Sequence, residues 1–404
     1  MGYLALLRDR NILHLWLGTT ISISGDVIFA VSLNWIVLEI THSLLWVSLS
    51  IISFVSPYIL VAPFAGNLVD RSEKVKVMSV GLLIEGLIMS VLSLLYLTGN
   101  FVVPIILVGV FTMVSFRQIP SAALSAMLPE MVTADDLGTS NSMFSFAVGV
   151  AQLTGFGIGG VILVLFGPIV PITYDALTFF IAVIVIQNMS FRSGPKEEAS
   201  LSSRFMKQFR DGIHSLIESK TLIQLLLVNM TIVFFGGMLE PLFVGYSSII
   251  SGGMASAYGL ILSFLTAGAA LSSYLLGHTN IRKIAGLLVL LNLPIMGLLM
   301  IMLGISNFLP ISFLLSFLLG ASYPLSTVTT SSLVQIKSES GRIGLVSSTF
   351  GSLTLVPSVI GSLTAGFLSE YISVRLLFII PGFVLLIIFF VMLLFLNDVR
   401  KAGY

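Results

Sequence analysis

The sequence predicts an all-α polytopic membrane protein with twelve transmembrane helices, and three features of the chain lead to this fold class. Charged residues make up only 9% of its 404 positions and apolar residues 56%, whereas a soluble domain carries about 25% charged residues. Long apolar runs recur along the chain and give a mean hydropathy of +1.08. Of the nineteen Lys and Arg residues, all but Arg117 and Arg375 fall in every second gap between those runs.

The apolar runs are long enough to cross a bilayer as helices. A transmembrane helix needs about 20 mostly apolar residues, and in lipid every backbone group has to find its hydrogen-bond partner within the protein. Strands of a membrane barrel are about half that length, so the runs predict helices. The predicted spans are 12–38, 44–65, 76–98, 101–124, 139–166, 170–190, 221–248, 254–277, 284–304, 308–331, 343–368 and 374–396.

The positions of the basic residues predict the orientation of these spans. Lys and Arg are retained on the cytoplasmic side during insertion, so an even number of spans places both termini in the cytoplasm. We therefore expect a multi-pass protein of the cell (plasma or inner) membrane. In the last outer turn, which breaks the charge pattern, we expect Arg375 to pair with Glu370. Bases otherwise occur at the N-terminus, in the C-terminal tail and at 66–76, 191–220, 278–283 and 332–342.

One gap between spans is much longer than the others and divides the chain. Residues 191–220 place apolar side chains at helical spacing among six bases, a pattern typical of an amphipathic helix on the membrane surface. We expect one six-helix bundle over 1–190, a cytoplasmic amphipathic linker over 191–220 and a second six-helix bundle over 221–404. A weak repeat at a distance of about 205 residues relates the halves, which predicts two pseudo-symmetric bundles, the layout of rocking transporters.

The sequence lacks several motifs that are typical of hydrolases, ATP-driven pumps and metalloproteins. The chain has no Cys, and its four His residues show no metal-ligand spacing. It also has no His-Glu-x-x-His, Gly-x-Ser-x-Gly or Gly-Lys phosphate-loop motif. We therefore expect neither an enzyme nor a metal, cofactor or nucleic-acid binder. The expected partners are the lipid bilayer, a small-molecule substrate and protons, and the expected state is a monomer.

The gap between the second and third spans carries the most specific motif. It reads Gly66-Asn-Leu-Val-Asp70-Arg71-Ser-Glu-Lys74, which resembles the signature of the major facilitator superfamily, although Glu stands where the family usually has Gly. The resemblance implies that Asp70 pairs with neighbouring helix ends and latches the two halves in one access state. It also implies the major facilitator fold. The alternative is that these residues only anchor the turn at the headgroups.

Arg117 lies in the cytoplasmic part of the fourth predicted span. We assign it to the latch motif, as a counter-charge for an acid such as Asp70. The alternative is an Arg that extends its charged end to the membrane surface.

The fifth span is similar to the antiporter motif of the same superfamily. Gly155, Gly159 and Gly160 match its small residues, whereas Phe156 occupies the position where the motif has Pro. Small residues let helices approach closely in lipid, so ordinary helix packing is the alternative to a role in antiport.

Further segments resemble the macrolide-efflux and siderophore-export branch of this superfamily. The resemblance implies a secondary transporter that exports drug-like or siderophore-like molecules by proton-coupled alternating access. The alternatives are an importer or facilitator of a small nutrient, and a sensor or scaffold that no longer transports. The matching segments are Leu15-Trp-Leu-Gly, Ser24-Gly25-Asp26, Glu39-Ile-Thr-His-Ser43, Pro120-Ser-Ala-Ala, Leu128-Pro-Glu-Met-Val132, Tyr174-Asp175-Ala-Leu-Thr-Phe179 and Tyr258-Gly259.

Acidic residues inside spans are costly in lipid and are therefore functional candidates. Asp26, near the middle of the first span, is a candidate proton or cation site, with a structural hydrogen bond as the alternative. Glu240, followed by Pro241, is a second candidate for proton coupling or for a cationic substrate, with a hydrated carboxylate as the alternative. For Glu85 we expect a structural pair or a protonated state. For Asp175 we expect a structural anion near a helix N-terminus.

The first, seventh and tenth spans line the central cavity in the superfamily, and here they contain neither Lys nor Arg. This composition favours hydrophobic or amphipathic cargo over a sugar or an organic anion. Each aromatic residue, taken alone, is also compatible with ordinary helix packing. The candidate cavity-lining residues are Phe29, Asn34, Trp35, Asn229, Phe234 and Tyr323.

Overall fold

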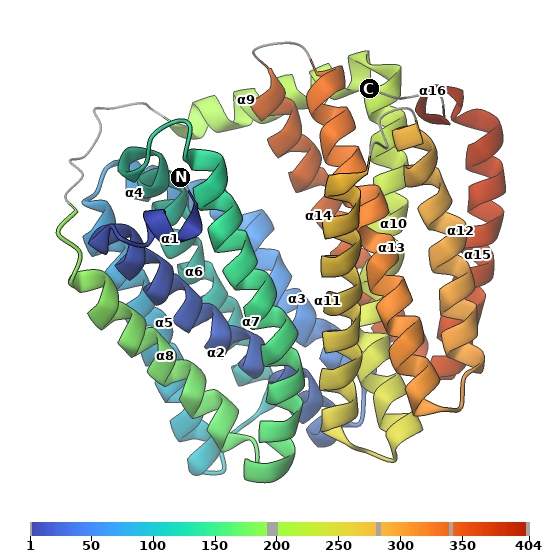
Figure 1. Ribbon diagram of the computed structural model, residues 1–404. Coiled ribbons are helices and arrows are strands. Elements are labelled where there is room, and N and C mark those ends of the chain that lie inside the picture. Colours follow the sequence, from blue (N-terminus) through green and yellow to red (C-terminus); the bar gives the residue numbers. More distant parts are fainter. Residues whose placement is uncertain (1, 192–200, 280–283, 339–341, 401–404) are drawn as a thin grey trace. The chain divides into compact units, whose positions relative to one another are not determined.

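The computed structural model is built entirely of helices over the residues that it describes (Figure 1). These residues are 2–191, 201–279, 284–338 and 342–400, and none of them forms a strand. Part of the predicted linker, 192–200, lies outside the described residues, as do Arg282, Lys283 and Lys401 among the predicted cytoplasmic bases.

The chain divides into two compact units. The first unit comprises residues 1–40 and 53–201, and the second unit comprises 41–52 and 202–404. The unit boundary therefore falls inside the second predicted span as well as near the middle of the chain.

The first unit is formed by the short helix α1 (Tyr3–Leu6) and by long helices that correspond to the first six predicted spans. The helix α3 contributes to both units. The bounds are α2 Arg10–Thr41, α3 Leu44–Leu60, α4 Ala62–Asp70, α5 Lys74–Leu97, α6 Val103–Met131, α7 Leu137–Phe166 and α8 Ile169–Gln187.

Besides residues 41–52, the second unit contains α9, which lies in the predicted linker, and the helices that follow it. The last of them, the short helix α16, has no counterpart among the predicted spans. The bounds are α9 Leu201–Glu218, α10 Lys220–Ser251, α11 Ala255–His278, α12 Ala285–Ile305, α13 Leu309–Lys337, α14 Ile343–Ser369, α15 Val374–Phe395 and α16 Asn397–Arg400.

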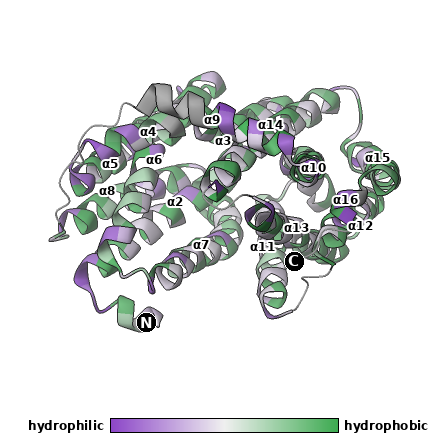
Figure 2. Cartoon of the chain, turned by 90° about the horizontal axis from the view of Figure 1, so that it is seen from above, coloured by the Kyte–Doolittle hydropathy of each residue, from purple (hydrophilic) through white to green (hydrophobic). Residues whose placement is uncertain are grey.

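The number of membrane-spanning helices agrees with the sequence. Eleven described helices are long and apolar enough to cross a bilayer, and the bent pair α3 and α4 supplies the twelfth. Figure 2 shows hydrophobic colouring over most of the long helices. The most apolar of them is α15, whose mean hydropathy reaches 3.1 over 18 residues. Large apolar side chains such as Leu165 and Phe395 are exposed, as expected for surfaces that face lipid. The prediction of a twelve-helix, all-α membrane protein is confirmed.

The second span differs from its predicted straight form. The helix axes of α3 and α4 meet at 54°, and Pro lies within α3 at Pro57 and in the first turn of α4 at Pro63. A Pro removes a backbone donor and clashes with the preceding turn, which bends helices. Gly66 and Asp70 are consequently helical, whereas the sequence placed them in a loop.

Several helices extend past the apolar runs that predicted them. The fourth span, predicted to end at 124, continues as α6 to Met131, and the tenth, predicted to end at 331, continues as α13 to Lys337. The apolar criterion measures only the part of a helix that lies in hydrocarbon, so it ends before the backbone hydrogen bonding does.

The helix α9 packs against α14 within the second unit. A Cβ atom at Gly212 would overlap the side chain of Thr349, and Arg342 donates a hydrogen bond from Nη1 to Ser215 Oγ at 3.4 Å. Leu216 is buried, but Ile217, which the sequence pattern placed on the same apolar face, is exposed.

The short helix α16 is fastened to the start of α10. Gln224 Nε2 donates to Asp398 Oδ2 at 3.0 Å, and Gln224 Oε1 accepts from the backbone N–H of Val399 at 3.2 Å. Lys220 Nζ lies 3.2 Å from the same Asp398 oxygen. Three polar contacts therefore hold α16 on the first turns of α10.

The predicted ion pair in the last outer turn is wrong. Glu370 Oε1 instead accepts a hydrogen bond from Ser43 Oγ at 2.5 Å, and the described residues contain no Glu370–Arg375 pair. The short α14–α15 turn suggested a local partner, whereas the hydrogen bond goes to a residue next to the start of α3.

Candidate functional site

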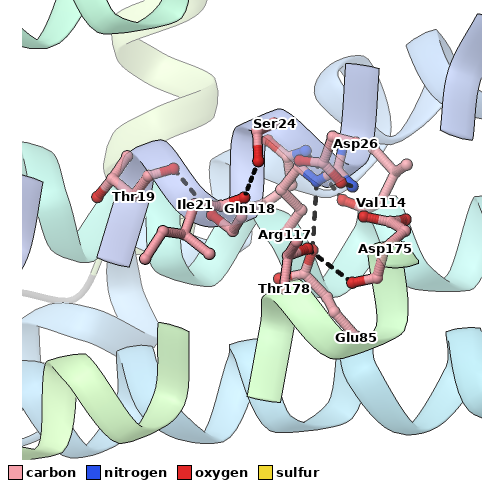
Figure 3. A network of polar contacts seen from close by, with 11 residues as sticks. Thr19, Ile21, Ser24, Asp26, Glu85, Val114, Arg117, Gln118, Asp175 and Thr178 are labelled. Carbon is pink, nitrogen blue, oxygen red and sulfur yellow. Dashed lines mark hydrogen bonds and ion pairs between the residues drawn. The ribbon is translucent and has the colours of Figure 1, made fainter. Parts of the chain in front are cut away.

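Four ionisable residues from four different helices meet inside the first unit (Figure 3). Asp26 lies on α2, Glu85 on α5, Arg117 on α6 and Asp175 on α8. Asp175 is fully buried and the Glu85 side chain is 1% exposed, while the side chains of Asp26 and Arg117 are 14% and 18% exposed. These four residues are called the Arg117 cluster below.

The guanidinium of Arg117 holds two carboxylates at once. Its Nη2 donates to Asp26 Oδ1, and its Nε donates to Glu85 Oε2 at 3.2 Å. The planar guanidinium presents several donors in fixed directions, so that it can bridge acids that come from different helices. The helices α2, α5 and α6 are thereby tied together at one point.

Asp175 belongs to the cluster through charge and proximity rather than through a hydrogen bond. Both of its carboxyl oxygens, and Oε1 of Glu85, are buried and have no hydrogen-bond partner among the described residues. Asp175 interacts electrostatically with Asp26, Arg117 and Glu85. The nearby Thr178 hydroxyl donates to the backbone carbonyl of Asp175 at 2.7 Å, and not to the carboxyl group.

A glycine allows α2 to approach α8 at this point. A Cβ atom at Gly25 would lie 2.5 Å from Asp175 Oδ1 and 3.0 Å from its Cα, and would overlap the Thr178 hydroxyl. Only a residue without a side chain fits such a contact. The sequence Gly25-Asp26 therefore combines the helix contact with the acid that enters the cluster.

The small residues of α7 pack against α2 immediately after Asp26. A Cβ atom at Gly155 would lie 2.9 Å from Val27 Cγ1, and one at Gly159 would lie 3.2 Å from Ile28 Cα. Gly160 is buried in the same helix. The antiporter-like motif thus sets the position of α2, the helix that carries Asp26. Ordinary helix packing, the alternative interpretation of the motif, predicts the same contacts.

The cluster contains three acids and one base. If all three carboxyl groups were ionised, two negative charges would be buried without compensation, at a cost of several kcal/mol each. Charge balance in the apolar interior therefore requires the acids to hold protons. Among the described residues, no group of His, Asp and Glu has a geometry that could hold a metal ion. The chemistry that this arrangement supports is the binding and exchange of protons.

The structure corrects the assignment of Arg117 to the latch motif. Arg117 pairs with Asp26 and Glu85, not with Asp70. It lies thirteen residues before Glu130, the residue of α6 that contacts the latch segment, and thirteen residues of helix span about 20 Å. Arg117 therefore lies too deep in the bundle to reach that segment.

The latch motif itself joins α4, α5 and α6. Gly66 lies within α4, Asp70 is its last residue and the exposed Arg71 is its C-cap. Lys74, the first residue of α5, is only 2% exposed, and its Nζ lies 2.6 Å from Glu130 Oε1. Among the described residues Asp70 forms no ion pair. The partner of Asp70 in the latch remains a prediction.

Two of the predicted cavity residues, Asn229 and Tyr323, line one cavity of the second unit. This cavity has a volume of about 270 Å³ and lies between α10, α13 and α14. Its walls combine hydroxyl groups with apolar side chains and include no charged residue. The other lining residues are Val233, Thr327, Thr330, Ser331, Val334, Ser347, Phe350, Gly351, Thr354 and Leu355.

The remaining predicted residues of α2 are buried. The Phe29 ring lies 6.2 Å from that of Phe54, Asn34 is buried, and Trp35 Nε1 donates to Glu39 Oε1 at 2.7 Å. These contacts are those of packed side chains, the alternative that the sequence left open.

In the second unit, Phe234 stacks edge-on with Phe235 at 5.2 Å. Glu240 is exposed and forms no ion pair among the described residues. The helix α10 continues through Pro241.

The convergence of Glu85 and Asp175 with Asp26 was not predicted. The sequence identified each acid separately, but it gave Asp175 a local explanation, the dipole at the start of its helix. Asp175 is the seventh residue of α8, beyond the first turn where such a dipole acts. The available signal was the pairing of Gly25 with Asp26, because a glycine beside a buried acid indicates a close helix contact.

A family model described as transmembrane secretion effector matches residues 1–402 of the chain. Macrolide efflux protein A of Streptococcus pyogenes is 23% identical over 396 residues, which cover 96% of each chain. The staphyloferrin A transporter of Staphylococcus aureus is 22% identical over 259 residues, or 62% of this chain and 63% of that one. Among solved structures, the nucleoside transporter NupG superposes with a TM-score of 0.75 at 10% identity, covering 95% of this chain and 98% of that one.

Proposed function

The chain belongs to the transmembrane secretion effector family of the major facilitator superfamily, and from this premise we propose that it exports hydrophobic or amphipathic small molecules by proton-coupled alternating access. The membership makes it a multi-pass membrane transporter that acts on a small molecule. The similarity to proteins named for macrolide efflux and staphyloferrin A transport supports export, while the NupG superposition supports the fold alone.

The single observation that carries proton coupling is the Asp26–Arg117 pair within a buried cluster that has more acids than bases. A proton that reaches Asp26 neutralises the carboxylate and removes its attraction to Arg117. Because these residues lie on α2 and α6, loading and unloading the proton changes the force between two helices. Such a change biases one access state over the other, as a coupled transporter requires.

The proposed exchange is antiport. With both termini in the cytoplasm, as the basic residues predict, a proton that enters down its gradient is exchanged for cargo that leaves the cell. The latch segment, with Asp70, Arg71 and the Lys74–Glu130 pair, lies on the cytoplasmic side in this orientation. It is therefore placed to stabilise one of the two access states.

The uncharged cavity of the second unit supports neutral or amphipathic cargo. Ligand sites usually enclose about 300–1,000 Å³ and combine apolar walls with a few polar groups. At about 270 Å³, this cavity accommodates one part of a larger cargo, held by hydroxyl groups and the Asn229 amide. Glu240 is the second candidate for proton coupling or for binding a cationic group of the cargo.

The proposal is tested with purified protein in vesicles that carry an imposed pH gradient. A panel of macrolides, siderophores and cationic dyes is offered, and we expect accumulation of at least one compound that collapses when the gradient is removed. Asp26→Asn should abolish the gradient-driven part. The matched control is Asp135→Asn, which removes an acid from the exposed α6–α7 turn.

The other outcomes separate the alternatives. Movement that does not respond to the gradient would indicate a facilitator, and net uptake into the cytoplasmic compartment would indicate an importer. Movement of no compound would favour a sensor or scaffold. An Asp26→Asn protein with full gradient-driven efflux would contradict proton coupling at this residue.

A further inference from the structure

We propose that Arg117 changes its ionised partner during transport, from Asp26 to the more deeply buried acids of the Arg117 cluster, and that Asp175 is the second residue that gains and loses a proton. The inference rests on the proposed function and deepens it, because it makes proton coupling an exchange between two sides of one cluster. It gives Glu85 and Asp175 a role in transport. Proton binding at the Asp26–Arg117 pair alone does not give them one.

The buried cluster can tolerate only a small net charge. One guanidinium compensates one carboxylate, and each additional buried ion costs several kcal/mol. In the arrangement observed, Asp26 is the acid paired through Nη2 of Arg117. Neutrality then leaves Glu85 and Asp175 with one proton each, which fits their buried and unpartnered oxygens.

The change of partner moves one proton into the cluster and one proton out of it. When Asp26 takes a proton from the solution, its charge is lost and Arg117 is left without an ionised partner. Asp175 then releases its proton and becomes the ionised partner, while Glu85 keeps the hydrogen bond that it accepts from Arg117 Nε. One proton enters and one leaves, so the cluster stays neutral. The proton is taken up beside α2 and released on the side formed by α5 and α8.

Few charged or titratable groups lie near Asp175. The charged and titratable groups that face it are Asp26, Glu85 and Arg117, each from a different helix. The neighbouring α7 has no titratable residue. On its own helix Tyr174 is adjacent, and Tyr58 of α3 interacts electrostatically with Arg117. Only the cluster itself can therefore compensate a charge on Asp175.

A purely structural role does not require an acid at this position. A buried Asp that never ionises could be replaced by Asn, which has nearly the same shape and avoids the risk of a buried charge. The close contact at Gly25 places the carboxyl of Asp175 directly beside the residue that precedes Asp26. At that position the two acids lie close enough to influence each other's protons.

The experiment measures protonated carboxylic acids by infrared spectroscopy of the intact protein in lipid nanodiscs, without any cargo. Asp26→Asn imitates the protonated state of Asp26. If Arg117 then acquires a new ionised partner, the C=O band of protonated acids falls by the equivalent of one group, although Asn cannot itself contribute to that loss. A static cluster predicts an unchanged band.

A double variant isolates Asp175. In Asp26→Asn/Glu85→Gln, Asp175 is the only acid left beside Arg117, and we expect it to ionise, so that the protonated-acid signal of the cluster disappears. Retention of that signal would overturn the proposal. Thr178→Val is the matched control, because it alters the same contact between α2 and α8 without a titratable group, and it should leave the spectrum unchanged.

Transport supplies a second readout. With erythromycin as the probe, Asp175→Asn should keep its fold and its cargo binding but lose gradient-driven accumulation about tenfold or more. A structural acid would predict wild-type accumulation in this variant, whose side chain imitates the protonated form. If the infrared bands respond as expected but no compound in the panel is moved, the proposed export function fails while the partner exchange stands.

Discussion

The two units of this transporter have interiors of different chemistry. The first unit buries Arg117 among three acids and the Lys74 side chain against Glu130. In the second unit, the described ion pairs, His214–Glu218 and Lys220–Asp398, are at the surface. Its interior is held by neutral groups, such as Tyr246 with Ser312 at 2.7 Å and Asn292 with Ser326 at 3.0 Å.

Glycine contacts mark the same difference. In the second unit, a Cβ atom at Gly268 would overlap the carbonyl oxygen of Phe317, and one at Gly320 would overlap that of Leu265. Here the backbones of α11 and α13 touch directly, whereas in the first unit Gly25 faces an acidic side chain. We infer a division of labour in which the Arg117 cluster of the first unit is the main site of proton exchange and the cavity of the second unit contacts cargo.

The largest loss of stability is expected when the Arg117 cluster loses its cation. Arg117→Met leaves three buried acids without a counter-charge, and breaking a buried pair in this way costs about 3–5 kcal/mol. The protein should melt at a much lower temperature in detergent. Combining it with Asp26→Asn and Glu85→Gln should restore most of the stability, because the cluster is then nearly as neutral as the second unit. Failure of this rescue would mean that Arg117 acts through packing and not through charge.

A smaller loss of stability is expected when the Lys74–Glu130 pair is broken. Lys74→Met removes the buried cation that lies 2.6 Å from Glu130 Oε1 and should cost about 1.5–3 kcal/mol, the range for hydrogen bonds to charged groups. The exposed Lys76 provides the matched control, since Lys76→Met removes the same charge two residues away. Equal melting temperatures for the two variants would contradict a buried structural pair.

The sequence predicted the parts of the fold that depend on composition and missed those that depend on how helices meet. Apolar runs located all twelve spans, since lipid requires them to be apolar. They could not locate the bend between Leu60 and Ala62 or the helical course of Gly66–Asp70, because these depend on Pro and on contacts beyond the hydrocarbon.

The same distinction holds for the site. Asp26 was identified because an acid in a span is costly wherever it lies. The partner of Arg117 could not be identified, since an Arg in the cytoplasmic part of a span can extend toward the surface or inward. Only the packing of α2, α6 and α8 decides between these directions, and Asp175 joins the cluster through that packing alone.

The direct backbone contact between α11 and α13 in the neutral unit should be sensitive to added bulk. Gly320→Ala forces α11 and α13 apart, and overpacking of this kind costs about 1–3 kcal/mol. Gly236→Ala, at a helical glycine with nothing within 4 Å of the added atom, should be neutral or stabilising by about 0.5–1 kcal/mol. Thermal unfolding of both variants checks the expectation, which is refuted if Gly320→Ala is as stable as the control.

The smallest effects should come from the cavity. Tyr323→Phe removes one hydroxyl group from its wall, which at about 0.5–1.5 kcal/mol corresponds to roughly a 2–10-fold rise in KM for a cargo that binds there. The pH dependence of transport should not change, because the cavity has no charged lining residue. A shifted pH profile in this variant would break the proposed separation between the units.

The attachment of α16 to α10 has a consequence for the biogenesis of the molecule. Gln224 and Lys220 lie at the beginning of the second unit's first long helix, and their partner Asp398 follows its last one. The ribosome has to synthesise more than 170 intervening residues before this contact can form. The insertion of α10 and the final docking of its start are therefore separate events, and a chain truncated before Asp398 should insert in the membrane without these contacts at the start of α10.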